Sequence, residues 1–121
     1  MRVGLARVSG HSMEPTLRPG DLVLVAHGAR VRPGRLVVVQ LPAGPMGARP
    51  LGIKRARCRR IVDGRVGWWV TSDNPGQGTD SRTFGAVEPG AVVAVGLCRV
   101  PRWVTRLMPS SEGTQRPTGL G

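Results

Sequence analysis

Short apolar runs, each closed by glycine or proline, are the feature that most constrains the fold of this chain. The runs are six to ten residues long and rich in valine, which favours strands over the longer helices of a bundle. The 18 glycines and 11 prolines between and around them suit a loop-rich β protein. We therefore expect β-strands over residues 3–8, 21–26, 35–41, 53–62, 65–71 and 91–100.

The connections are a hairpin and several long loops. Asp63-Gly64 is a dipeptide typical of two-residue hairpin turns, so the runs on either side of it should pair antiparallel. Long irregular loops are expected over residues 42–52 and 72–90, and a helical turn over residues 102–108.

The length of 121 residues fits one domain with a tail. We expect a mainly β, small antiparallel domain of about six to eight strands over residues 1–108. Residues 109–121, rich in proline, glycine and serine, are expected to be disordered.

The formal net charge of +11 makes the surface attractive to nucleic acid, anionic lipid or an acidic protein, and charge alone does not choose among them. No stretch approaches the ~18 consecutive apolar residues that a membrane-spanning helix needs. The N-terminal stretch "MRVGLARVSG" lacks the apolar segment of a secretory signal. These features predict a cytoplasmic protein with no transmembrane segment.

The cysteines and histidines do not form a metal motif. Cys58 and Cys98 lie far apart in the chain, and His11 and His27 are isolated from them. A zinc site needs more ligands at suitable spacings. We therefore expect two reduced thiols, and no metal or other cofactor.

Lys54 is the single lysine in a chain that otherwise uses arginine. A guanidinium does not lose its proton at workable pH, whereas a buried amine can. The alternation of the strand predicts that Lys54 shares an inward face with Ala56 and Cys58. The other face, expected to be wet, carries Ile53, Arg55, Arg57 and Arg59. Burial should lower the pKa of Lys54 and make it a candidate general base.

A base of this kind implies a nucleophile. Ser12 lies in the turn "SGHSMEPTLRPGD", where a hydroxyl can be exposed between two strands. Serine and lysine form a known variant of the activated-serine arrangement. Because the two residues are 42 positions apart, they can meet only through the fold.

Three segments resemble the conserved boxes of type I signal peptidases and their relatives. "SGHSMEPTLRPGDLVLV" is similar to the nucleophile box, "IKR" at 53–55 to the strand of the lysine base, and "SDNPGQGTDSRTFG" to the third box. The three segments occur in the family's order over residues 9–85. The resemblance implies an antiparallel β-fold like that of signal peptidases and SOS-repressor proteases.

The resemblance also implies roles for individual residues. Ser12 takes the position of the nucleophile and Lys54 that of the base. Backbone N–H groups, those of Gly10 and Ser12, are expected to form the oxyanion hole. Supporting roles are implied for Met13, Asp73, Asn74, Asp80 and Arg82, with Asp80 and Arg82 forming a salt bridge. A serine that orients the lysine in many family members is replaced by Gly78, so Thr79 or a water is expected to take over that contact.

Among small relatives, the chain resembles the nickel-type superoxide dismutase maturation proteases of actinobacteria. The resemblance rests on the "GWWV" strand running into "SDNPGQGTDS", the following "FGAV" and the short length. It implies removal of the N-terminal leader of the dismutase precursor by a serine endopeptidase. Nickel would then belong to the substrate and not to this chain.

Three alternatives remain at this point. The first is a general signal-peptidase-like protease that acts at a membrane. The second is a self-cleaving repressor, which would need a DNA-binding domain and an internal cleavage loop that the sequence lacks. The third is a non-catalytic basic β-module that binds nucleic acid through Arg55, Arg57, Arg59 and Arg60. The aromatic residues available for base stacking are few: Trp68, Trp69, Trp103 and Phe84.

Overall fold

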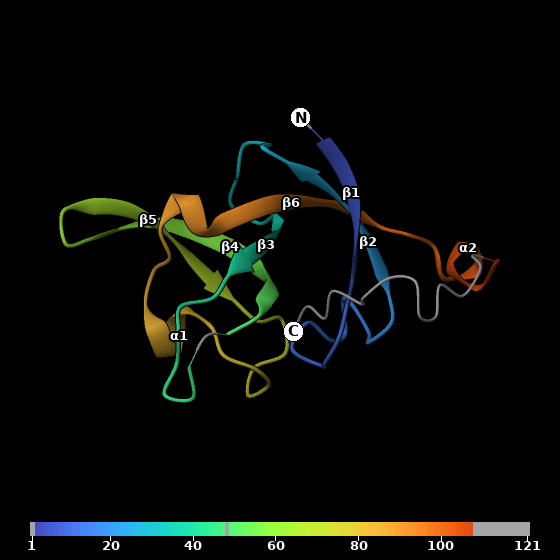
Figure 1. The fold of residues 1–121 in the computed structure, drawn as a ribbon, viewed down its shortest axis with the longest axis horizontal. Coiled ribbons are helices and arrows are strands. Elements are labelled where there is room, and N and C mark those ends of the chain that lie inside the picture. The colour runs from blue at the N-terminus through green and yellow to red at the C-terminus, as the bar shows by residue number, and fades with distance from the viewer. Residues whose placement is uncertain (1, 48, 108–121) are drawn as a thin grey trace.

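The computed structural model describes residues 2–47 and 49–107, and these form one six-stranded antiparallel sheet. Its strands are β1 (Arg2–Arg7), β2 (Leu22–His27), β3 (Leu36–Gln40), β4 (Leu51–Val62), β5 (Arg65–Thr71) and β6 (Val92–Arg99). The strand order is β1-β2-β6-β3-β4-β5, so β6 is inserted between β2 and β3. Figure 1 shows β1 and β2 on one side of the sheet and the β4–β5 hairpin on the other. The expected small antiparallel fold is confirmed.

Three short helices complete the described chain: α1 (Ser81–Phe84), the 3₁₀ helix η1 (Pro89–Ala91) and α2 (Arg102–Leu107). Helix α1 lies within residues 72–90 and η1 begins there, where a long loop was expected, so that expectation was wrong in part. Helix α1 forms because Asp80 caps it, its carboxylate accepting the N–H of Arg82. The helical turn expected near residue 102 is present as α2. The expected disordered tail lies outside the described residues.

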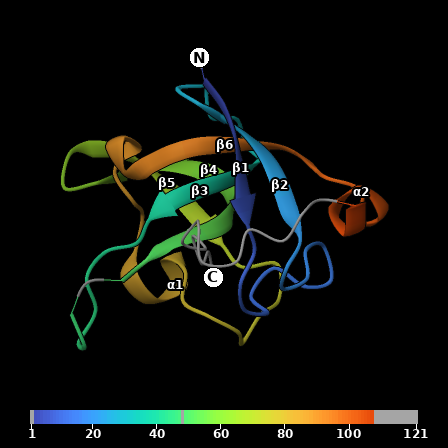
Figure 2. The ribbon, with the colours of Figure 1, turned by 45° about the vertical axis from the view of Figure 1, so that its right-hand side comes forward.

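Both faces of the sheet bury side chains in separate clusters. On β3, Val38 packs into one cluster with Met13 and Leu17, while its neighbours Val37 and Val39 point into the other. This arrangement explains why "LVVVQ" is apolar throughout instead of alternating. The view in Figure 2 shows how the sheet twists between its two sides.

Strand β4 contains a one-residue β-bulge at Arg57. Cys58 pairs with Trp69 and Ala56 pairs with Val70, which leaves Arg57 without a partner on β5. An extra residue moves every side chain beyond it to the opposite face. The simple alternation predicted that Cys58 shares the face of Lys54, and that prediction was wrong.

The face of β4 that was expected to be wet is also different in the structure. Arg59 pairs with Trp68, and its guanidinium lies over the Trp68 ring, on the face that carries Ala56. Ile53 is 1% exposed and belongs to the core, and Arg55 is half-buried. The half of β4 before the bulge is thus enclosed on both faces, and only the half after it projects toward solvent.

Candidate active site

The turn that carries Ser12 is built on the core beneath it. Ser12 and Met13 are both buried, and the Met13 side chain packs with Leu17 in the cluster of Val38. The N–H of Leu17 donates to the carbonyl of Met13 at 2.9 Å, which closes a helical turn directly after the serine. The packing of Met13 and Leu17 in the core therefore fixes the backbone that presents the Ser12 hydroxyl.

The segment after β5 is tied to this turn by its backbone and side chains. The N–H of Asn74 donates to the Ser12 carbonyl at 2.8 Å, and the Asn74 amide donates to the carbonyl of His11 at 2.9 Å. The N–H of Asp73 lies 3.4 Å from the sulfur of Met13, as a weak donor contact. Two segments that are 60 residues apart in sequence are thereby held edge to edge.

Asp73 joins the same segment to β4. Its carboxylate accepts from the Arg55 guanidinium at 2.7 and 2.9 Å and from the Thr16 hydroxyl at 2.7 Å. Burial by itself would raise the pKa of Asp73, but the hydrogen bonds from Arg55 and Thr16 lower it below its ordinary value. The carboxylate is therefore charged and fully engaged by Arg55 and Thr16.

Lys54 is fully buried, with 0% of its surface exposed. Its amine donates to the Ser72 hydroxyl oxygen at 3.1 Å, and no ion pair of Lys54 occurs among the described residues. Burial lowers the pKa of Lys54, and the more distant charge of Asp80 offsets only part of that effect. The site thus favours the neutral amine, which is the form that can accept a proton.

Ser72 is itself held by a charged side chain. The N–H of Ser72 donates to the Asp80 carboxylate at 3.0 Å, and Asp80 forms an ion pair with Arg82 at 2.8 Å. Burial would raise the pKa of Asp80, but hydrogen bonds from the Arg82 side chain and from the N–H groups of Ser72 and Arg82 lower it. Asp80 and Arg82 accordingly lie behind the site, where they support Ser72.

Ser12 and Lys54 both lie beside the bare backbone of Gly78. A Cβ placed on Gly78 would lie 2.9 Å from the Ser12 Cβ, 3.7 Å from its Oγ and 3.4 Å from the Lys54 Nζ. The φ of Gly78, +71°, is also one that favours glycine. The hydroxyl and the amine therefore flank one point that only glycine leaves open. A serine hydroxyl near a buried amine of lowered pKa is an arrangement suited to nucleophilic catalysis.

The hydroxyl that reaches Lys54 is that of Ser72, a residue that the sequence reasoning did not select. Within the described chain, no hydrogen bond joins Lys54 to Thr79, which was one of the two expected replacements. The hairpin register read from the sequence points to the wrong residue. Counted straight from the Asp63-Gly64 turn, Asp73 would lie opposite Lys54; the bulge at Arg57 advances the register by one residue and brings Ser72 there instead.

The backbone N–H groups beside Ser12 are the remaining element of the site. For residues 2–47 and 49–107, no protein acceptor is found for the N–H of Gly10 or of Ser12. Gly10 has a φ of +76°, which turns the chain just before the serine. Neither donor is therefore used by an acceptor within the described residues.

None of the helices in residues 2–47 and 49–107 is long and apolar enough to cross a bilayer. The same residues hold no group of three or more histidine, cysteine, aspartate or glutamate side chains suited to a metal ion.

Comparison with known proteins identifies the family of the chain. The family model described as Peptidase S24-like matches residues 2–88, a span that includes Ser12, Lys54 and the segment from Ser72 to Arg82. The chain is also similar to mitochondrial inner membrane protease subunit 2 of Danio rerio, with 31% identity over 136 aligned residues that cover 93% of this chain and 73% of that protein. No solved structure matches. The chain therefore belongs to the Peptidase S24-like family, and the two matches together support a serine protease of the signal-peptidase-like type.

Proposed function

We propose that Ser12 is the nucleophile and Lys54 the general base of an endopeptidase. The observation that carries the proposal is the convergence of the Ser12 hydroxyl and the buried Lys54 amine on Gly78. The lone pair of the neutral amine takes the hydroxyl proton as Oγ attacks the scissile carbonyl carbon. The N–H groups of Gly10 and Ser12 stabilise the resulting oxyanion.

The same lysine then returns the proton. Lys54 protonates the leaving amine, which frees the downstream product and leaves an acyl group on Ser12. A water molecule, deprotonated by Lys54, hydrolyses this ester and restores the serine. Each proton that Lys54 accepts is therefore passed on within the cycle, and no metal or cofactor takes part in the proposed steps.

We propose that the substrate is a precursor protein whose N-terminal leader is removed, and that the precursor is that of nickel superoxide dismutase. The resemblance of the "GWWV" strand and of "SDNPGQGTDS" to the maturation proteases supports this choice. The proposal places the reaction in the cytoplasm and assigns the nickel to the substrate. A general signal-peptidase-like protease is the second candidate, because the matched relative is named as a subunit of a mitochondrial inner membrane protease.

The decisive experiment mixes purified protein with the full-length dismutase precursor and measures the intact mass of the product. Wild type should release a shortened dismutase with a new N-terminus, and the Ser12→Ala variant should leave the precursor intact. An intact precursor in a reaction that cuts generic signal-peptide substrates would replace the proposed substrate by the general one. If wild type cuts neither, the proposed endopeptidase activity is wrong.

A further inference from the structure

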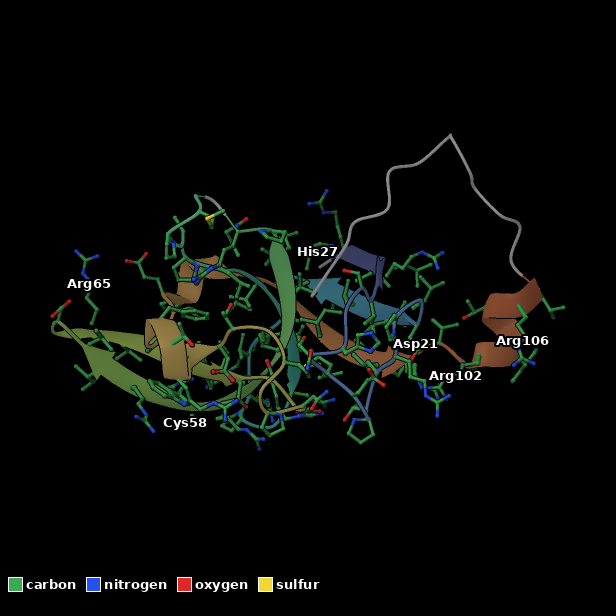
Figure 3. The ribbon with its side chains drawn as sticks, turned by 90° about the horizontal axis from the view of Figure 1, so that it is seen from below. Asp21, His27, Cys58, Arg65, Arg102 and Arg106 are labelled. Atoms are coloured by element: carbon green, nitrogen blue, oxygen red, sulfur yellow. The ribbon has the colours of Figure 1, made fainter. Side chains whose placement is uncertain are left out.

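A hollow of about 530 Å³ lies on the outer part of β4, beside the loop before β3. It is lined by Arg30, Val31, Arg32, Pro33, Cys58 and Arg59. The loop is fastened to β4 by two backbone hydrogen bonds, from the Gly34 N–H to the Ala56 carbonyl at 2.7 Å and from the Ala56 N–H to the Arg35 carbonyl at 2.9 Å. Figure 3 labels Cys58, one of the lining residues, away from α2 with its labelled Arg106.

The three arginines of the hollow have no acidic partner in the described chain. The ion pairs of residues 2–47 and 49–107 engage five carboxylates, and none of these pairs includes Arg30, Arg32 or Arg59. Other arginines of β4 are engaged elsewhere: Arg55 binds Asp73, and Arg57 donates to Thr71. The positive charge of this hollow is therefore concentrated and uncompensated, unlike the charge beside the serine.

Arg59 is also held in position. Its guanidinium carbon lies 5.4 Å from the centre of the Trp68 ring, and Trp68 is only 5% exposed. A guanidinium stacked on an aromatic ring keeps the N–H groups at its edge available for a carboxylate. Because this contact already orders the Arg59 side chain, a ligand that binds it loses less free energy in ordering it.

We propose that this hollow binds an acidic segment of the protein substrate, as a recognition site separate from Ser12. Three guanidiniums suit carboxylates, and the floor of Val31, Pro33 and Cys58 suits the aliphatic parts of a peptide. Trp68 is covered by Arg59 and offers no face for stacking a nucleobase, which favours a peptide over nucleic acid. The substrate role rests on the proposed endopeptidase function, whereas the binding of an acidic peptide does not.

The separation along the strand suits one continuous substrate. Cys58 follows Lys54 by four residues on β4, roughly 13 Å at about 3.3 Å per residue. A peptide with its scissile bond at Ser12 therefore needs only a few extended residues to place carboxylates in the hollow.

A binding experiment with the Ser12→Ala protein tests the site without cleavage. The probe is a fluorescein-labelled peptide containing four consecutive Asp or Glu residues, and its affinity is measured by fluorescence anisotropy. A peptide with lysines at the four positions is the charge control. Alkylation by N-ethylmaleimide, measured by mass spectrometry, gives the location: the acidic peptide should slow modification of Cys58, which lines the hollow, and leave the exposed Cys98 unchanged.

Two matched double variants separate the hollow from the overall charge. Arg30→Gln with Arg32→Gln should weaken binding of the acidic peptide at least about tenfold, because charge-assisted hydrogen bonds are lost. Arg99→Gln with Arg106→Gln removes the same charge at exposed positions elsewhere and should change the affinity by no more than about twofold. Neither pair disturbs Arg59 and Trp68, and circular dichroism checks that both variants fold.

Three results would overturn the proposed site. They are equal weakening by both double variants, loss of Cys98 alkylation together with that of Cys58, and tighter binding of a single-stranded oligonucleotide of equal charge. In the active protein, the Arg30 and Arg32 variant should raise KM for an acidic protein substrate and leave cleavage of a short neutral peptide unchanged. Acidic-peptide binding in a protein that cuts nothing would retain the site and reject the endopeptidase function.

Discussion

The two halves of β4 treat positive charge in opposite ways. Before the bulge, Lys54 is completely enclosed, and Arg55 is half-buried and engaged by Asp73. After the bulge, Arg59 and Arg60 lie over tryptophan rings with their charged groups toward solvent. Burial of an amine lowers its pKa, whereas a guanidinium stays charged in either place. One strand can thus supply a proton acceptor at one end and a permanent cation at the other.

The largest effect is expected from exchanging lysine and arginine in the enclosed half. Lys54→Arg keeps the positive charge but removes the neutral base, so kcat/KM should fall about 10²–10⁴-fold. The matched exchange in the outer half, Arg60→Lys, should change kcat/KM less than about twofold, because its role is limited to stacking on Trp69. Substantial cleavage by Lys54→Arg in a peptide assay would reject Lys54 as the base.

The pH dependence distinguishes an enclosed amine from an exposed one. Because burial lowers the pKa of Lys54, kcat/KM should rise about tenfold per pH unit and level off below 10.5, the ordinary lysine value. The sign follows from the neutral amine being the active form, so raising the pH populates it. The Arg60→Lys variant should keep the same profile. A rising limb centred at 10.5 or above would mean that the fold does not depress this pKa.

Ser72→Ala tests whether the amine must be oriented as well as buried. Removing the hydroxyl leaves the buried amine without its partner, at a cost of about 1–3 kcal/mol; with that cost carried by the transition state, kcat should fall about five- to 150-fold. KM should stay unchanged, and Ser72→Thr, which restores a hydroxyl, should recover most of the activity. A fall in thermal stability with unaltered kcat would assign Ser72 a structural role alone.

The smallest difference concerns the ion pairs that flank the two halves. Asp73→Asn breaks a buried charge-assisted pair with Arg55 and should lower the free energy of unfolding by about 2 kcal/mol. Glu88→Gln breaks the exposed pair with Arg65, whose closest atoms are 4.0 Å apart, and should cost less than about 0.5 kcal/mol. Urea denaturation of the two variants at neutral pH measures both values.

The acid dependence gives a further check on the Asp73 pair. The folded state lowers the pKa of Asp73, so its stabilisation is present above the ordinary value of 3.8 and is lost as the pH falls through the lower folded value. The stability difference between wild type and Asp73→Asn should therefore shrink below pH 3.8. A difference that stays constant to lower pH would mean that the charge of Asp73 does not matter.

The strands could be predicted because each buried run is bounded by glycine or proline, and "LVVVQ" shows the signal at its clearest. Helix α1 could not, since four residues carry no helical period and the only cue was Asp80 at its N-cap. Lys54 was found through its uniqueness among arginines and Ser12 through the turn it occupies. The role of Ser72 could not be predicted, because strand alternation does not reveal that Arg57 is unpaired. A slip of one residue changes every facing pair beyond it.

That unpaired residue makes the register of one hairpin a determinant of protonation. If Arg57 paired with Val70, the ladder would run without interruption and set Asp73 against Lys54. A carboxylate at that position would stabilise the ammonium form and raise the pKa of the lysine, with all the proposed catalytic side chains still in the sequence. A slip of one residue at the bulge would then inactivate the protein by an electrostatic route, whereas deletion of Arg57 itself would remove the bulge and leave Ser72 opposite Lys54.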